Sequence, residues 1–354
     1  MMIAPLQDRH VQMLQEAWQA FDGSKGIRQM EELSAKVSQN RVFRLTFEDQ
    51  STLIAKCSSY GEYEQFIDDH IRIRQWSEAL AGSQFQGFLA DTLVKENQIF
   101  SHFGNPEWVI FYEEKPIASS LPKILTMKQV GFFAREIGKF HQQSLPLSQK
   151  MAPLQKSAMT DIRDLYVSLD LKATPYPLLD SERKYLMEQC ETFLKEMDRL
   201  GYHHRTRIPL LIDWNIGNFS IKGEEEQFQF ESRWDYDWFR MEPAMFDFYF
   251  CSRIVSHEGD RADFSYWPHG FFEPRFKHFL THYQLENPLF GEDIFFLKEV
   301  YRFFILNYVI KDGPKFFRPQ YFQRLKQESI HLYLPEIDSF DFYHLYQDLK
   351  RVLK

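Results

Sequence analysis

The N-terminal third of the chain carries both helical and strand-like patterns of apolar residues. Apolar side chains recur at helical spacing over 5–22, over a shorter segment at 27–36, and again over 62–81. Between them, residues 41–56 alternate apolar and polar positions on both sides of an EDQS turn, which is typical of a β-hairpin. The runs FQGFLADTLV and EWVIFYE, within 85–113, predict two more strands. We therefore expect a β-rich region that also contains helices.

The remainder of the chain is mainly helical, with one strand-rich island at 208–237. Helical spacing is found over 127–144, 160–171, 181–201 and from 243 to the end. Strands that precede helices, instead of alternating with them, favour the α+β class over a doubly wound parallel sheet. With about 150 residues per domain as a guide, we expect two lobes, 1–113 and 114–354.

Composition and charge narrow the function classes. The net charge of −8, from 42 basic and 50 acidic residues, argues against a nucleic-acid or anionic-membrane binder. The cysteines, Cys57, Cys190 and Cys251, form no CxxC pair, so neither a zinc knuckle nor a disulfide framework is expected. The N-terminus lacks the pattern of a signal peptide, and no uncharged apolar run approaches the ~18 residues of a membrane span. We expect a cytoplasmic protein and leave its oligomeric state open.

The strand-rich island carries the candidate chemistry. Asp213 and Asn218 follow an apolar run, and a predicted hairpin over 219–234 then returns the chain to Asp235 beside them. Phosphoryl transfer needs a carboxylate for the acceptor hydroxyl and oxygen ligands for Mg²⁺. Asp and Asn also favour turns for backbone reasons, so spacing alone leaves both interpretations open.

These motifs resemble those of the aminoglycoside phosphotransferase and choline kinase group. The resemblance rests on D-W-N-I-G-N, a hairpin, W-D-Y-D-W and a downstream F-D-F, together with S-Q-N-R-V-F-R-L and L-I-A-K in the first hairpin. It runs in order from Ser38 to Phe248. It implies a bilobal protein-kinase-like fold, with a β-rich N-terminal lobe that binds nucleotide and a mainly helical C-terminal lobe that carries the catalytic loop and acceptor site.

On the nucleotide side, the resemblance implies that Lys56 contacts the α- and β-phosphates from its strand. Its partner would be an acid on the next helix, either Asp69 or Glu64. The loop over the phosphates would be 38–40, with Asn40 at its end, because the first hairpin has no GxGxxG. The hinge whose backbone meets the adenine would comprise Phe111, Tyr112, Glu113 and Glu114.

On the catalytic side, the resemblance implies that Asp213 is the catalytic carboxylate and that Asn218 and Asp235 are the metal ligands. Asp237 would lie near the metal, and Asp247 would bond the backbone of the catalytic loop. One departure stands out, because the His-Gly that precedes the catalytic aspartate in that group is Leu211-Ile212 here.

Together these features predict an ATP- and Mg²⁺-dependent phosphotransferase acting on a hydroxyl of a small molecule. Two alternatives remain open, a nucleotide-binding pseudokinase and a kinase acting on protein. The segment 256–272 is expected on the acceptor side, where acidic and aromatic residues favour an amine-bearing acceptor through charge and cation–π contact. Those residues are Glu258, Asp260, Asp263, Phe264, Tyr266 and Trp267.

Overall fold

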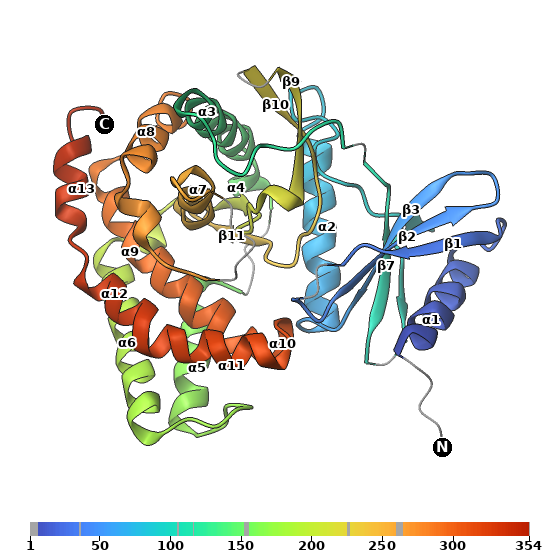
Figure 1. Ribbon diagram of the computed structural model, residues 1–354, viewed down its shortest axis with the longest axis horizontal. Coiled ribbons are helices and arrows are strands. Elements are labelled where there is room, and N and C mark those ends of the chain that lie inside the picture. The colour runs from blue at the N-terminus through green and yellow to red at the C-terminus, as the bar shows by residue number, and fades with distance from the viewer. Residues whose placement is uncertain are drawn as a thin grey trace.

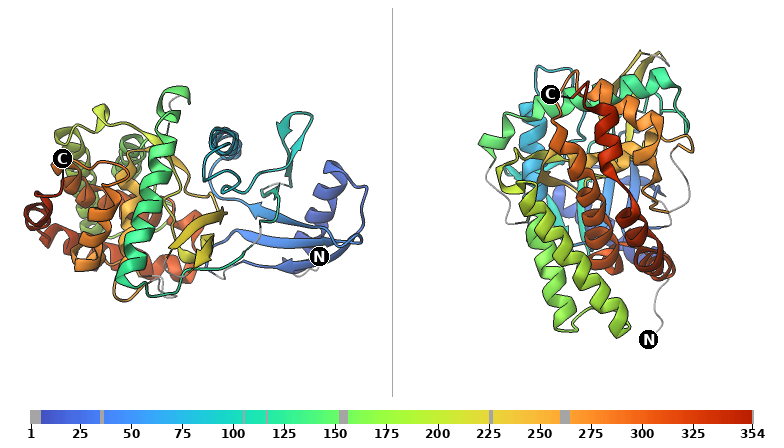
Figure 2. Two further views of the ribbon diagram at one scale, coloured as in Figure 1. Left: turned by 90° about the horizontal axis from the view of Figure 1, so that it is seen from above. Right: turned by 90° about the vertical axis from the view of Figure 1, so that its left-hand side faces the viewer.

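The protein consists of a smaller lobe built on a β-sheet and a larger helical lobe (Figures 1 and 2). The computed structural model describes residues 6–34, 37–104, 106–115, 117–151, 156–224, 227–259 and 265–353. No helix within these ranges is both long enough and apolar enough to span a membrane. The expected α+β architecture with a β-rich lobe and a mainly helical lobe is confirmed.

The smaller lobe is a five-stranded antiparallel sheet in the order β1-β2-β3-β7-β6. Its strands are β1 (Ile27–Glu32), β2 (Arg41–Phe47), β3 (Thr52–Ser58), β6 (Ser101–Phe103) and β7 (Trp108–Tyr112). Alternate side chains of β7 point to opposite faces. Val109 and Phe111 join the core under helix α1 (Leu6–Phe21), whereas Ile110 joins the core shared with α2 (Tyr63–Ala79).

Two predictions for this lobe were wrong, whereas both long helices and the 41–56 hairpin are confirmed. Residues 27–32 form the edge strand β1 rather than a helix, because their backbone pairs with β2. The run FQGFLADTLV is mostly turns, and only its last residue enters a short strand, β4 (Val94–Lys95), which pairs with β5 (Gln98–Ile99). Its apolar residues Phe85, Phe88 and Leu89 are buried in the core of the larger lobe.

The larger lobe confirms the predicted helices to within a few residues. Its longer helices are α3 (Met127–Ser144), α5 (Ala158–Asp170), α6 (Asp180–Arg199), α7 (Phe248–Val255), α8 (Pro274–Tyr283), α9 (Gly291–Phe304), α11 (Pro319–Glu328) and α13 (Phe342–Leu349). The shorter ones are α4 (Leu147–Lys150), α10 (Gly313–Phe316) and α12 (Leu334–Ser339), and π-helical turns cover Ile305–Lys311 and Ser329–Tyr333. Helix α3 begins with a capping box between Thr126 and Gln129, which satisfies backbone groups at its N-terminus.

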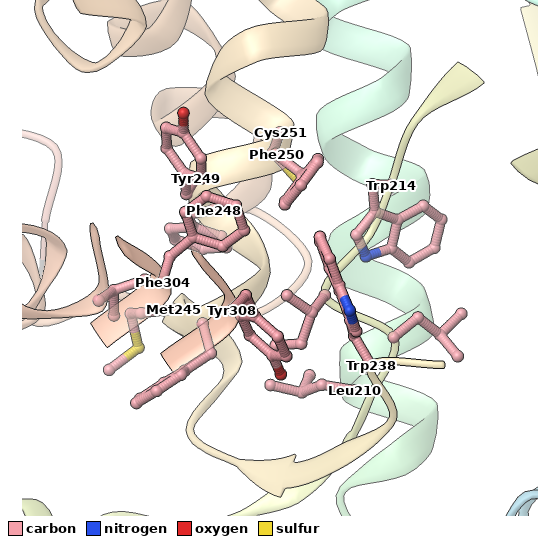
Figure 3. Packing of buried hydrophobic residues seen from close by; sticks show 14 of the residues in the cluster. Leu210, Trp214, Trp238, Met245, Phe248, Tyr249, Phe250, Cys251, Phe304 and Tyr308 are labelled. Carbon is pink, nitrogen blue, oxygen red and sulfur yellow. The ribbon is translucent and has the colours of Figure 1, made fainter. Parts of the chain in front are cut away.

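Aromatic side chains make much of the core of the larger lobe (Figure 3). Tyr249 and Phe250 of α7 pack against Phe304 of α9, and Trp238 stacks on Tyr308 with ring centroids 4.5 Å apart. Such pairs add to the free energy gained by burying apolar area. The contacts with Phe304 hold helix α7 at the centre of the larger lobe.

The three cysteines are free and buried in the cores of the two lobes.

The strand-rich island forms two antiparallel pairs embedded among the helices. Strand β9 (Phe219–Glu224) pairs with β10 (Gln227–Arg233), as the sequence predicts. Strand β8 (Ile208–Leu210) pairs with β11 (Arg240–Glu242). The second pair brings the chain just before Asp213 alongside the chain just after Asp237, so the polar residues of the island gather in one place.

Helix α2 of the smaller lobe is fixed to α3 of the larger lobe by one tryptophan. The Trp76 ring stacks on Phe140 with centroids 4.9 Å apart, and its Nε1–H donates to the Ser144 hydroxyl at 2.9 Å. Trp76 is fully buried. Because the indole is packed and hydrogen-bonded, α2 cannot shift relative to α3 without breaking both contacts.

A second junction, the interlobe clasp, joins residues 37–40 to residues 314–318. The Gln39 N–H donates to the Phe316 carbonyl at 2.8 Å, and Gln39 Nε2 donates to the carbonyls of Pro314 and Phe317. The Arg318 N–H donates to the Val37 carbonyl at 3.0 Å. The start of β2 is thus bound to the segment around α10, where the two lobes meet in Figure 1.

We expect Trp76→Ala to lower the free energy of unfolding by roughly 3–5 kcal/mol, because it leaves a cavity at the junction of α2 and α3. Trp76→Phe keeps a ring there and loses the bond to Ser144, so its cost should be clearly smaller. Urea denaturation followed by circular dichroism measures both. Equal costs for the two variants would contradict this account of the junction.

Candidate active site

A cavity of about 670 Å³ lies between the lobes and is lined by both of them. From the smaller lobe it takes Leu33, Ser34, Val42, Arg44, Ile54, Lys56, Ala90 and Tyr112, and from the connection Glu113, Glu114, Lys115 and Ile117. From the larger lobe it takes Asn215, Gly217, Asn218, Trp234, Asp235, Arg253 and Tyr266. Much of the lining surface is apolar, and charged residues come from both lobes and from the connection.

The ammonium of Lys56 lies between two carboxylates of the larger lobe. Its Nζ is 3.0 Å from Asp235 Oδ1 and 2.5 Å from Asp237 Oδ1, and its side chain is only 6% exposed. Burial alone would lower the pKa of Lys56, but the two carboxylates outweigh this and raise it. The same ammonium holds the pKa of Asp235 below its usual range, against the effect of burial. Lys56 is therefore a fixed cation in the cleft.

The predicted partner of Lys56 on the next helix is not found. Asp69 forms no ion pair with Lys56, and its Oδ1 has no hydrogen-bond partner among the described residues. Burial raises the pKa of Asp69 to about 6. Glu64 is exposed and lines a separate depression on the lobe surface. The pairing prediction is wrong for both residues, because Trp76 holds α2 against α3 and the two aspartates of the larger lobe take the place of a helix acid.

Asn40 lies close to Lys56, although not over a phosphate site. Its Nδ2 donates to Asp237 Oδ2 at 2.7 Å, and its Oδ1 accepts from the Ser58 hydroxyl at 3.1 Å. Residues 38 and 39 belong to the interlobe clasp. The loop predicted to cover phosphates therefore binds the larger lobe here, and the cleft is lined on that side by Ser34 and Val42.

The predicted hinge is only partly in the cleft. Tyr112 and Glu113 line it, but the Phe111 side chain points the other way and stacks on Phe100 in the core under α1. Strand alternation sends neighbouring side chains to opposite faces. The hinge is expected to meet the adenine through its backbone, so for Phe111 this stays a prediction. The Glu113 N–H already donates to the Asp91 carbonyl at 3.0 Å, and the Tyr112 hydroxyl contacts His70 Nε2.

Asp213 lies in the loop between β8 and β9. Its Oδ1 accepts hydrogen bonds from the backbone N–H and the side-chain amide of Asn215. Burial, followed by the negative charge of Asp235, raises the pKa of Asp213 to about 7, and the charges of Arg233 and Arg253 act in the opposite direction. A carboxylate with such a pKa exchanges a proton readily near neutral pH, as a general base must.

Asn218 and Asp235 have the donor set of a magnesium site. Asn218 Nδ2 donates to the Asp213 carbonyl at 3.3 Å, which leaves the amide oxygen available to a metal. The Asp235 side chain is 38% exposed to the cleft. Two carboxylates beside one ammonium leave a local excess of negative charge, and hard oxygen ligands are those that Mg²⁺ prefers. The residues present therefore fit the expected metal.

The backbone around Leu211-Ile212 keeps the shape that glycine would favour. Ile212 has φ of 60°, in the left-handed region that costs a β-branched residue of order 1–3 kcal/mol. The Ile212 N–H donates to Asp247 Oδ1 at 2.8 Å, as expected for Asp247. The Trp214 Nε1–H and the His141 Nε2–H both donate to Asp247 Oδ2. His141, on α3, thus supports the loop, whereas the histidine that Leu211 replaces would have lain within the loop itself.

Arg233 is a second supporting residue that sequence analysis missed. It is fully buried, and its guanidinium donates to the backbone carbonyls of Asp213 at 2.6 Å and Asn218 at 2.7 Å. It therefore ties together the two ends of the loop that runs from Asp213 to Asn218. An arginine at the end of the predicted strand, directly before Trp234-Asp235, was the sequence feature that could have drawn attention to it.

Comparison with known proteins supports the architecture. No family model and no curated protein matches the sequence. Solved structures do match over nearly the whole chain. An amicoumacin kinase in complex with AMP-PNP, Ca²⁺ and Ami is 14% identical, with a TM-score of 0.63 over 96% of this chain and 100% of that one.

Two further solved structures agree with this result. A microcompartment-associated aminopropanol kinase is 14% identical, with a TM-score of 0.57 over 90% of this chain and 94% of that one. An aminoglycoside 2'-phosphotransferase in a GDP complex is 13% identical, with a TM-score of 0.55 over 94% and 97% of the two chains. The chain has the protein-kinase-like fold of these enzymes. The resemblance seen in the sequence is thus confirmed at the level of the fold.

We expect Asp213→Asn to stabilise the protein in a pH-dependent manner. The pKa of Asp213 rises from 3.8 to about 7 on folding, so the native state binds this proton more tightly than the unfolded state. The ionised aspartate therefore reduces stability as pH increases from about 4 to 7. At pH 8 the variant should be more stable by on the order of 1–3 kcal/mol, and the gain should disappear near pH 4. Urea denaturation at both pH values measures it, and an equal gain at both would contradict the shifted pKa.

Proposed function

We propose that the protein transfers the γ-phosphoryl group of ATP, with Mg²⁺, to a hydroxyl group of a small molecule. The observation that carries this proposal is the convergence of four groups on one interlobe cleft. Lys56, Asn218 and Asp235 line the cavity, and Asp213 lies in the loop that carries Asn215 and Asn218 into it. Each has a chemical role that phosphoryl transfer requires.

Asp213 accepts the proton of the acceptor hydroxyl. The acceptor oxygen forms a bond to Pγ of ATP as the bond from Pγ to the β–γ bridging oxygen breaks, and ADP leaves. Lys56 neutralises charge on the phosphates. To reach them, its ammonium gives up one of its two carboxylate contacts and binds a phosphate oxygen instead. Asn218 and Asp235 would hold Mg²⁺, which neutralises charge on the phosphates when bound. Arg233, Asp247 and His141 keep the loop in position, so catalysis rests on preorganised charge.

Three kinds of observation support a small-molecule acceptor and a purine nucleotide, which we propose is ATP. The structures that share the fold are named as kinases or phosphotransferases of small molecules, and one of them holds AMP-PNP and another GDP. The cleft has an apolar wall at Val42, Ile54 and Ala90 beside the connection between the lobes, which suits a flat base. Lys56 and Asp235 line the same cavity and are the groups that we assign to the phosphates.

The alternative is a nucleotide-binding pseudokinase. Leu211-Ile212 and the lack of a helix acid paired with Lys56 favour it. The network of Asp247, His141 and Trp214 argues against it, because that network keeps the catalytic loop in place without the usual histidine. The two functions differ in whether ATP turnover depends on Asp213.

The class of acceptor suggested by the sequence, an amine-bearing molecule, stays a prediction. Of the segment that suggested it, Tyr266 lines the cleft, whereas Trp267 stacks on His269 with centroids 5.2 Å apart. Three other residues of that argument, Asp260, Asp263 and Phe264, lie outside the described residues.

We expect Asp235→Ala to remove most of the Mg²⁺-dependent part of nucleotide binding, because it deletes a proposed metal ligand. Calorimetric titration with AMP-PNP, with and without Mg²⁺, measures this. Exposed Asp198 of α6 provides a matched control, and Asp198→Ala should bind as the wild type does. Equal Mg²⁺ dependence in wild type and Asp235→Ala would reject the metal assignment.

We expect Asp213→Asn to reduce ATP turnover by about 10²-fold or more, the scale of a positioned acid–base group. Nucleotide affinity should change only a few-fold, since the interaction is made mainly in the transition state. Lys56→Ala should instead weaken both. Background ATP hydrolysis, with water as acceptor, provides a rate that needs no knowledge of the substrate. Identical rates in wild type and Asp213→Asn, with no acceptor that accelerates the wild type, would leave the pseudokinase as the better description.

A further inference from the structure

Arg253, on α7, presents a cation to the cleft close to the catalytic loop. It lines the cavity together with Tyr266. Its guanidinium lies 5.3 Å from the ring centroid of Phe250 and 5.2 Å from that of Tyr266. These ring contacts hold the side chain in one place. The rings contact the face of the guanidinium, so the N–H groups at its edge can still donate hydrogen bonds to a ligand.

Arg253 differs from the other cations of the cleft in its lack of an acidic partner. The cationic residues that line the cavity are Arg44, Lys56, Lys115 and Arg253. Each of the first three forms ion pairs with two carboxylates. In the part of the chain that the structure describes, no carboxylate lies within ion-pair distance of Arg253. A partly buried guanidinium without an anion is costly unless a ligand supplies one.

Arg253 lies on a different element from the groups assigned to the phosphates. Lys56 is on β3, and Asn218 and Asp235 flank the β9–β10 hairpin, whereas Arg253 is in the last turn of α7. With Tyr266 it forms a part of the cavity wall that those groups do not occupy, and we assign this part to the acceptor. Helix α7 begins directly after Asp247, which bonds the catalytic loop, so Arg253 and Asp213 are held by one rigid unit. The phosphate side of the cleft already has Lys56 and a metal site.

We propose that Arg253 binds an anionic group of the acceptor, a carboxylate or a phosphate, while the acceptor hydroxyl reaches Asp213. The planar guanidinium suits either group, because it donates two parallel hydrogen bonds to a pair of oxygens. Tyr266 covers the aliphatic part of the same acceptor. This inference rests on the proposed phosphotransferase function and names the substrate class of that site.

The test uses acceptors that are similar in size and differ in charge. Glycerol is neutral, 1-amino-2-propanol is cationic, and glycerate and glycerol 3-phosphate carry a carboxylate and a phosphate. ADP release with Mg·ATP, and the thermal midpoint of the Mg·ADP complex, are measured for each compound. The variants are Arg253→Gln, Arg253→Lys and, as a control for loss of one surface arginine, Arg199→Gln on α6.

We expect the anionic compounds to raise turnover and thermal midpoint above the neutral and cationic ones in the wild type. Arg253→Gln should increase the KM for the anions by about tenfold to a hundredfold, the value of a lost charge-assisted hydrogen bond, with a smaller change in kcat. Arg253→Lys should restore part of the loss, and Arg199→Gln should match the wild type. The anion that gives the larger increase in turnover and thermal midpoint shows whether Arg253 binds a carboxylate or a phosphate.

Two outcomes would overturn the inference. One is that neither anion exceeds glycerol and 1-amino-2-propanol in either measurement. The other is that Arg253→Gln weakens binding of AMP-PNP but not of ADP, which would assign the residue to the γ-phosphoryl group. Both can occur while Asp235→Ala still abolishes Mg²⁺-dependent nucleotide binding, so failure of this inference is distinguishable from failure of the proposed function.

Discussion

The burial of one lysine ammonium is the constraint on which the site depends. A charge that is almost removed from water must be paired, and Lys56 finds its pair in Asp235 and Asp237 across the cleft. Asn40 then satisfies the second oxygen of Asp237 and is itself bonded to Ser58. These bonds link β2 and β3 of the smaller lobe to the segment after β10 in the larger one. The same contacts that satisfy the ammonium therefore bring the two lobes together around the cavity.

The loop that carries Asp213 and Asn218 is held by buried polar groups that come from distant parts of the chain. Asp247 accepts three hydrogen bonds, from Ile212, Trp214 and His141. Arg233 adds bonds to two carbonyls of the loop. Because breaking any of them would leave a buried polar group without a partner, the network offsets the unfavourable backbone of Ile212. The loop can therefore keep its shape after replacement of the histidine and glycine common in the resembled group.

What the sequence revealed was largely local. Alternation in 41–56 and helical spacing in 127–144 depend on neighbouring residues, so both elements could be predicted, as could the gathering of Asp213, Asn218 and Asp235 around a hairpin. The edge strand at 27–32 depends on a partner strand for its conformation, and its own pattern was misleading. The partner of Lys56, the direction of Phe111 and the support by His141 and Arg233 depend on how distant elements pack, which spacing along the chain does not encode.

The interlobe clasp has a mechanical consequence. The lobes are joined covalently after β7 and by hydrogen bonds before β2, and these two strands lie on either side of β3. The Trp76 contacts between α2 and α3 form a further attachment. A rotation of one lobe about the line through the clasp and the covalent connection would have to break these contacts. The width of the cleft is therefore largely set before any ligand arrives.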